Sequence, residues 1–343
     1  MERIVALSDL HLGEDESTLR EEKVVNNLRD ELQKMGQIDQ LVLLGDVLDL
    51  SMASFSQAVE IAKEFFSKIG GLDEIKEIIF VPGNHDHHLW VQHIEHQAIV
   101  TKIQEGELPE KPDYIKEFKG KESFLSGLLP LKAKEKLTVK YPNHTAQVKD
   151  SNYFFHHGHH LSTEGTLLMT LKEALEKRAS LNDFELYNSP IHELIQYSLE
   201  QSDSMRKRME FAWEQGGALS AILTVVDEMT DKKGLGGRII HWGYWLSIIA
   251  GEMKSNAMRG SGIDERIVKD MERYLKLSGA DTSDWFVYGH THLPEGKRRK
   301  DGFSIVNAGS WLESSDRTYN TYIVIDDEVV VRRLGDTNPC WSK

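Results

Sequence analysis

The stretch Ile4-Val5-Ala6-Leu7-Ser8-Asp9-Leu10-His11 decides the fold, because a short apolar run ends directly in polar residues that can bind a ligand. The same pattern returns at Leu41–Asp49 and at Glu77–Asp86. Amphipathic segments at Ser17–Lys34 and Ala53–Lys68 separate the three runs, as expected for strands that alternate with helices. Because ligand sites of open α/β sheets lie beyond the carboxyl ends of the strands, we expect the three polar clusters to form one site.

Strand patterns resume later in the chain and are interrupted by a long helical region. Further strands are predicted at Leu137–Lys140, Asn152–Phe155, Asp284–Tyr288, Phe303–Val306, Tyr319–Ile325 and Glu328–Arg332, the last two forming a hairpin. From residue 163 onward, leucine, isoleucine and methionine recur at helical spacing. We therefore predict a catalytic domain at 1–160 and 281–343, split by a helical insertion, or cap, at 161–280.

The composition excludes several classes of protein. A chain of 343 residues with 40% hydrophobic residues is too apolar to be disordered, and its net charge of −14 disfavours a nucleic-acid partner. The single cysteine, Cys340, permits no internal disulfide and no thiolate metal cluster. The N-terminal residues lack the basic and apolar regions of a signal peptide, so we expect a cytoplasmic protein.

The most apolar segment, Ile239–Gly251, is shorter than the roughly 18 residues that a membrane-spanning helix needs. Three interpretations of it stay open: the core of the cap, a wall for acyl chains, or a surface that contacts lipid or a partner protein. We therefore predict no transmembrane segment and keep peripheral membrane contact as an alternative.

The polar residues after the strands form an inventory of metal ligands. Asp9 and His11 stand two residues apart, so strand geometry directs both side chains the same way, and His290 and His292 repeat this spacing. The complete inventory is Asp9, His11, Asp46, Asn84, His157, His290 and His292. Oxygen and imidazole donors without sulfur suit Mn²⁺, Fe, Zn²⁺, Co²⁺ or Ni²⁺ better than Ca²⁺ or Mg²⁺. Seven ligands are too many for one ion.

Five ordered motifs in this chain resemble those of the calcineurin-like metallophosphoesterases. They are Asp9-Leu-His11, Gly45-Asp46-Val-Leu-Asp49, Gly83-Asn84-His85-Asp86, His157-Gly158 and Gly289-His290-Thr-His292. The resemblance covers about 1–100, 137–160 and 284–333, includes Asn307-Ala-Gly-Ser310, and excludes the cap. It implies a layered α/β fold in which a β-sandwich is flanked by helices.

The resemblance also implies the role of each residue. One divalent metal ion would be held by Asp9, His11, Asp46 and His292, and the other by Asp46, Asn84, His157 and His290. Manganese is favoured, with Fe, Zn, Co or Ni as alternatives. A metal-bridging hydroxide would attack phosphorus in line. His85 would be the catalytic residue and would protonate the leaving alkoxide or stabilise charge on the phosphoryl group. Asp49 and Asp86 would orient histidines. Aligning His-Gly with the family pattern selects His157, with His156 and His159 as alternatives.

These roles predict a phosphoester hydrolase whose cap selects a small-molecule, nucleotide or lipid-linked substrate. Ser8–Leu12 is similar to the start of the UDP-2,3-diacylglucosamine hydrolases. At the third motif, however, the pattern of those hydrolases is similar to Asn-Arg-Asp, whereas this chain has Asn84-His85-Asp86. Double-strand-break repair nucleases share Asn-His-Asp, and the negative charge argues against them. The alternative from another class is a non-catalytic scaffold of the same fold.

Overall fold

The computed structural model describes residues 2–50, 53–161, 180–185, 263, 265–313 and 319–342. Most of the predicted cap, including Ile239–Gly251, lies outside these residues, so the domain boundaries stay a prediction. Among the described residues, no helix has the length and apolarity needed to cross a bilayer.

The larger sheet contains the first strands of the chain. Its order is β13-β12-β11-β1-β2-β3-β5-β4, with β1, β2, β3 and β5 parallel at the centre. The strands are β1 (Ile4–Leu7), β2 (Ile38–Leu44), β3 (Ile75–Val81), β4 (Glu117–Lys119), β5 (Leu137–Lys140), β11 (Thr321–Ile325), β12 (Val329–Arg333) and β13 (Trp341–Ser342). β11 pairs antiparallel with β1 and with β12, which confirms the predicted hairpin.

The smaller sheet joins segments that are far apart in the sequence. Its order is β6-β7-β8-β10-β9, and β7 pairs parallel with β8, where Tyr153 lies opposite Trp285. The strands are β6 (Asn143–Val148), β7 (Ser151–His156), β8 (Trp285–Tyr288), β9 (Glu295–Lys297) and β10 (Ser304–Asn307). The C-terminal part of the chain therefore completes a sheet that β6 and β7 begin.

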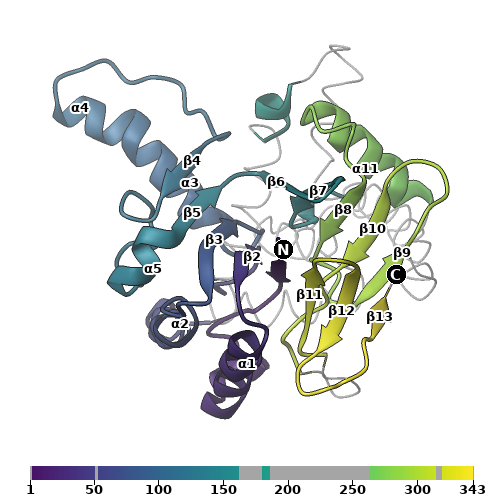
Figure 1. Cartoon of the computed structure of the whole chain (residues 1–343). Coiled ribbons are helices and arrows are strands. Elements are labelled where there is room, and N and C mark those ends of the chain that lie inside the picture. The colour runs from purple at the N-terminus through teal and green to yellow at the C-terminus, as the bar shows by residue number, and fades with distance from the viewer. Residues whose placement is uncertain are drawn as a thin grey trace, which may run out of the picture.

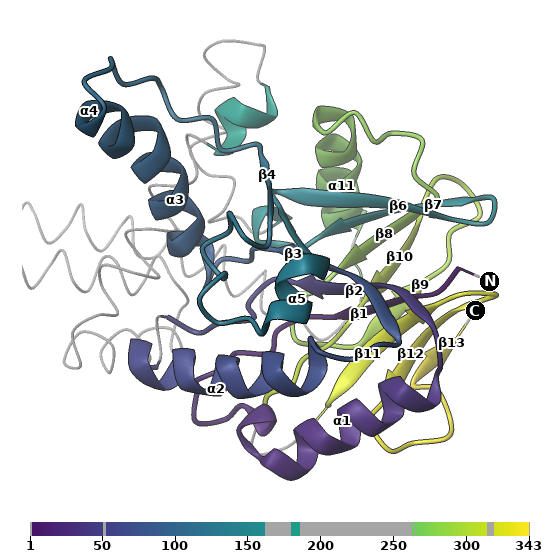
Figure 2. The same cartoon turned by 60° about the vertical axis from the view of Figure 1, so that its left-hand side comes forward.

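Helices cover the outer faces of both sheets (Figures 1 and 2). On the larger sheet they are α1 (Glu22–Lys34), α2 (Phe55–Ile69), α3 (His87–Glu95) and α5 (Leu131–Lys136). A π-helix, η2 (His96–Thr101), and the short α4 (Lys102–Gln104) extend α3 away from the sheets, and 3₁₀ turns lie at η1 (Thr18–Arg20) and η3 (His159–Leu161). α11 (Glu265–Leu277) packs on the smaller sheet.

Alternating side chains on β1 divide the core into layers. Val5 and Leu7 pack in the cluster beneath the helices, whereas Ile4 and Ala6 pack between the two sheets, as the two-residue period of a strand requires. A third apolar cluster holds α11 against the smaller sheet. The order of layers is helix, sheet, sheet, helix, which confirms the predicted α/β fold with a β-sandwich flanked by helices.

Candidate metal centre

The seven predicted ligands follow five strands of the two sheets. Asp9 and His11 follow β1, Asp46 follows β2, and Asn84 follows β3 in the larger sheet. In the smaller sheet, His157 follows β7, and His290 and His292 follow β8. Because the strands within each group are parallel, their carboxyl ends meet at one edge, where loops from both sheets converge.

The backbone at these positions is unusual. Seven described non-glycine residues have a positive φ, and five of them are predicted ligands: Asp9, His11, Asp46, His290 and His292, with φ between 45° and 67°. This left-handed conformation is unfavourable for residues with a side chain, and it gathers at functional sites. The surrounding structure must therefore hold these loops in place.

Hydrogen bonds between the loops supply this support. The Asp9 N–H donates to the Gly45 carbonyl at 3.1 Å, and the His11 N–H donates to the Asp46 carbonyl at 2.9 Å. At the smaller sheet, the Asn307 amide donates to the Gly289 carbonyl at 2.8 Å and to Thr291 Oγ1 at 3.0 Å. Asn307 thus fixes the turn that carries His290 and His292, a role for which its sequence gave no signal beyond the family resemblance.

Glycines before the ligands allow a close approach between loops. A Cβ atom at Gly83 would lie 2.3 Å from Asp46 Oδ1, and one at Gly289 would lie 2.4 Å from Asp9 Oδ2. Both distances are too short for any other residue without movement of the ligand. Loops are therefore packed directly on each other, within the larger sheet at Gly83 and between the two sheets at Gly289.

One group of predicted ligands joins the larger sheet to the β8 loop. His292 Nε2 lies 3.2 Å from Asp9 Oδ1 and 3.3 Å from His11 Nε2. His11 Nδ1–H donates to Asp49 Oδ2 at 2.8 Å, which leaves the lone pair of His11 Nε2 facing the group. The three side chains thus present carboxylate and imidazole donors to one point.

The second group contains Asp46, Asn84, His157 and His290. His157 Nδ1–H donates to the Leu44 carbonyl at 2.9 Å. Its Nε2 lies 3.0 Å from Asp46 Oδ2 and 3.1 Å from Asn84 Oδ1, and both of these oxygens are acceptors. A neutral His157 has no second proton, so only a proton or a bound cation makes this contact favourable. His290 offers a further nitrogen to Asp46 and His157.

Asp46 lies between the two groups. Its Oδ2 is 3.0 Å from Nε2 of His157 and 4.0 Å from Nε2 of His11. Its Oδ1 accepts a hydrogen bond from the His85 N–H at 2.9 Å. The carboxylate thereby faces one histidine from each group, as a bridging ligand must.

The residues expected to support the ligands do so in different ways. Asp49 Oδ2 accepts from His11 Nδ1–H and lies 3.2 Å from His85 Nδ1, so it contacts two histidines of the site. Asp86 instead accepts from the backbone N–H groups of Gly83 and Val47, at 3.0 and 3.1 Å. These two hydrogen bonds fasten the β2 loop to the β3 loop, and the orientation of a histidine by Asp86 stays a prediction.

Sequence reasoning missed one carboxylate at this site. Glu14 Oε2 lies 3.3 Å from Nδ1 of His11. Burial, followed by the charge of Asp49, raises the pKa of Glu14 to about 9, so its carboxyl group is protonated at neutral pH. The only sequence signal was its position three residues after His11.

Charges within the site control its protonation. Burial alone would raise the pKa of Asp46, but His157 and His85 hold it well below its ordinary value. For His157, burial is outweighed by Asp46, which raises the pKa to about 9. Burial, together with the charge of Asp46, raises the pKa of Asp86 to about 7. Without a metal ion, His157 therefore carries a proton that metal binding must displace.

The donor set fits divalent cations, and the site is open to solvent on one side. Two carboxylates, one amide oxygen and four imidazoles suit Mn²⁺ and its neighbours in the first transition row. The His292 side chain is 40% exposed and that of His85 is 18% exposed, whereas Asp9 and Asp46 are buried. A substrate would approach from the side of these two histidines.

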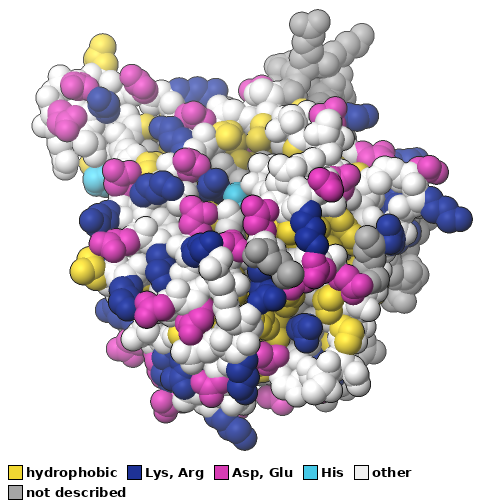
Figure 3. Space-filling model, in the orientation of Figure 1, with side chains coloured by type: hydrophobic (Ala, Val, Ile, Leu, Met, Phe, Trp, Pro, Cys, Tyr) yellow, Lys and Arg dark blue, Asp and Glu magenta, His cyan; other side chains and the backbone are white. Residues whose placement is uncertain are grey.

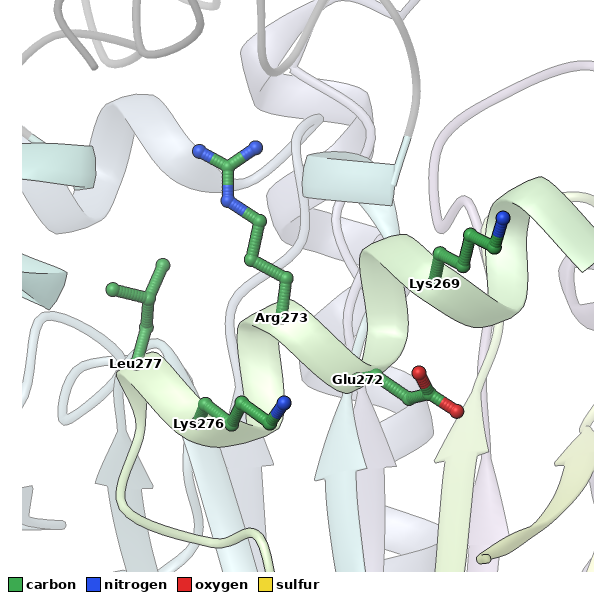
Figure 4. Close-up of a pocket in the computed structure, with 5 residues that line it drawn as sticks. All are labelled: Lys269, Glu272, Arg273, Lys276 and Leu277. Atoms are coloured by element: carbon green, nitrogen blue, oxygen red, sulfur yellow. The ribbon is translucent and has the colours of Figure 1, made fainter. Parts of the chain in front are cut away.

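Two surface features lie apart from the candidate centre. Acidic and basic side chains are interspersed on the face drawn in Figure 3, among the residues described there. A surface pocket is lined by Lys269, Glu272, Arg273, Lys276 and Leu277, all on α11 (Figure 4). None of these five residues belongs to the predicted site.

The fold and the two sets of predicted ligands at its strand ends are those of a metallophosphoesterase-type protein. The chain belongs to the calcineurin-like phosphoesterase family, because a sequence model of that family matches residues 2–209. None of the curated proteins compared with the chain matches it.

Similar solved structures include YfcE, a phosphoesterase from E. coli, at 14% identity and a TM-score of 0.38, covering 99% of this chain and 98% of that one. Vacuolar protein sorting 29 from Cryptosporidium parvum is 13% identical, with a TM-score of 0.37 and coverage of 100% and 98%. A predicted phosphoesterase from Streptococcus pneumoniae TIGR4 is 11% identical, with a TM-score of 0.32 and coverage of 100% and 98%.

Proposed function

We propose that the chain is a dinuclear-metal phosphoesterase that hydrolyses a phosphate mono- or diester. Asp9, His11, Asp46 and His292 would hold one ion, and Asp46, Asn84, His157 and His290 the other, with manganese as the favoured metal. The observation that carries this proposal is the contact of His157 Nε2 with two acceptor oxygens, while its Nδ1 already donates to Leu44. This is an arrangement that a cation stabilises.

Two bound divalent ions would lower the pKa of water and offset charge on the phosphoryl group. A side chain of the protein would provide the proton for the leaving group. Asp49 Oδ2 accepts from His85 Nδ1–H and would stabilise the doubly protonated imidazole, whose Nε2–H would then be given to the leaving oxygen. Because His85 is only partly buried, it can reach both the site and a substrate.

The substrate is proposed only as a class. A phosphoester of a small molecule, a nucleotide or a lipid-linked diphosphate fits the proposed chemistry, with selection assigned to the cap at 161–280. The UDP-2,3-diacylglucosamine hydrolase interpretation depends on that cap and stays a prediction, as does the cytoplasmic location.

The test combines metal content with turnover. Full-length protein loaded with Mn²⁺ is expected to hydrolyse p-nitrophenyl phosphate or bis-p-nitrophenyl phosphate. Asp46→Asn should fail to bind either ion of the centre, because one carboxylate would bind both ions. Its rate of hydrolysis should fall at least about 100-fold. Asp39→Asn is the matched control, since Asp39 pairs with Lys76 and accepts from the Arg3 backbone at a distance from the site.

Two results would contradict the proposal in different ways. A wild-type chain that binds manganese but hydrolyses neither ester would favour the scaffold interpretation. An Asp46→Asn variant that keeps both ions would remove the bridging role from Asp46, even if the chain is a hydrolase.

A further inference from the structure

A second cluster of histidines lies beside the candidate centre and has no role in the proposed reaction. His156 ends β7, and His159 and His160 follow in η3. All three are buried, with at most 1% exposure, and one nitrogen of each lies within 4.8 Å of the others. The groups of ligands at the candidate centre meet the same spacing. We call these residues the His156 cluster.

A buried carboxylate orients one member of this cluster. His160 Nε2–H donates to Glu185 Oε1 at 2.6 Å, and the Tyr141 hydroxyl donates to Glu185 Oε2 at 2.7 Å. Nδ1 of His160 then keeps its lone pair, because a neutral imidazole has one proton. A histidine that binds a metal ion through one nitrogen usually donates a hydrogen bond from the other, often to a carboxylate, and His160 has this arrangement.

The environment of His156 points to a ligand as well. Its Nε2 is fully buried and makes no hydrogen bond within the described residues. The aromatic ring of Tyr274 packs against the histidine, with ring centroids 4.4 Å apart. A buried polar atom without a partner is unfavourable unless water or an ion occupies the space beside it.

The chemistry of the cluster selects the kind of ion. Burial holds the pKa of His160 well below its ordinary value, so the imidazole is neutral and can bind metal. Three imidazole donors without sulfur suit Zn²⁺, Co²⁺, Ni²⁺ or Cu²⁺ and are poor ligands for Mg²⁺ or Ca²⁺. Glu185 contacts His160 and would offset part of the charge.

We propose that His156, His159 and His160 bind a third divalent cation of the zinc type, separate from the dinuclear centre. Through Glu185, this ion would tie the end of β7 and η3 to residues 180–185. At present the Gly158 N–H donates to His156 Nδ1 at 3.0 Å, which places the ring proton on Nε2. Binding through Nε2 moves that proton to Nδ1 and breaks this hydrogen bond.

The experiment counts ions per chain after metal-free, full-length protein is dialysed against Zn²⁺. The wild type is expected to hold three ions, Asp46→Asn one, and His159→Gln two. His96→Gln, which changes an exposed histidine on η2, is the control and should hold three. Nitrogen-15 spectra of the wild type should show the His156 proton moving from Nε2 to Nδ1 as the third ion binds.

A second variant guards against misfolding of His159→Gln. Glu185→Gln keeps the size of the side chain. It should lower the affinity for the third ion by about 10- to 100-fold without changing the affinity for the other two. Two ions in the wild type, or three in a folded His159→Gln, would overturn the proposal. So would the absence of a peak at the His156 cluster in zinc-edge anomalous maps of zinc-loaded crystals. Because Asp46→Asn acts only on the dinuclear centre, failure of one site is distinguishable from failure of the other.

Discussion

Asp49 Oδ2 lies 2.8 Å from Nδ1 of His11, and the same oxygen lies 3.2 Å from Nδ1 of His85. One fully buried carboxylate thus contacts both a proposed metal ligand and the proposed proton donor. Burial would raise its pKa, but the two histidines hold the pKa of Asp49 well below its ordinary value, so the group stays ionised. In the proposed function, Asp49 would therefore couple metal binding to proton transfer.

Replacing Asp49 should impair both functions. In Asp49→Asn the amide oxygen accepts more weakly than a carboxylate, so the rings of His11 and His85 are less firmly oriented. We expect manganese affinity to fall by 10- to 100-fold and the rate at saturating metal to fall as well. Competition with a chelator measures the affinity, and unchanged binding would remove Asp49 from the metal centre.

His85→Ala should separate binding from chemistry. Because His85 is not a proposed ligand, metal content should stay near that of the wild type while the rate falls by about 10²- to 10⁴-fold. The loss should be larger for an alkyl ester than for a p-nitrophenyl ester, since p-nitrophenolate leaves without a proton. Loss of metal ions, or an equal effect on both esters, would contradict the assigned role.

The central strands could be predicted because each is a buried apolar run that ends in polar residues. The prediction at Ile4–Leu7 matches β1. The helix predicted from Ser17 begins as α1 only at Glu22, because the chain first forms the 3₁₀ turn η1. The helix predicted from Ala53 begins as α2 at Phe55, since Ser54 caps it by accepting from the Gln57 N–H.

Elements without a clear period escaped the sequence analysis. β6 is rich in polar residues and draws its stability from pairing with β7, whereas β4, β9 and β13 are short strands. α3 was not predicted, because its histidines interrupt the helical pattern of apolar positions at Trp90, Val91 and Ile94. In the candidate site, the predicted ligands could be named from the sequence. The contacts of Glu14 and Asp86 could not, because they depend on which loops meet in the folded chain.

Gly289 should tolerate no side chain. In Gly289→Ala, the Cβ atom would lie 1.9 Å from Ser8 Oγ and 2.4 Å from Asp9 Oδ2, so Asp9 must move. We expect a loss of about 1–3 kcal/mol in the free energy of unfolding and weaker binding of the ion that Asp9 would hold. Gly127→Ala is the matched control, because no atom lies within 4 Å of its added Cβ. Equal stability of the two variants in urea unfolding would argue against this packing.

His144 should make the folded chain sensitive to acid. Its Nε2–H donates to Gln40 Oε1 at 3.0 Å, its buried Nδ1 has no hydrogen-bond partner within the described residues, and burial lowers the pKa of His144 to about 3. As pH falls below about 6.5, the unfolded chain gains a proton that the folded chain does not, so stability decreases. Between pH 6.5 and 5, the free energy of unfolding measured in urea should fall for the wild type. For His144→Gln it should fall by about 1.5 kcal/mol less. His96→Gln should follow the wild type, and equal pH slopes for His144→Gln and the wild type would mean that His144 is protonated in the folded chain.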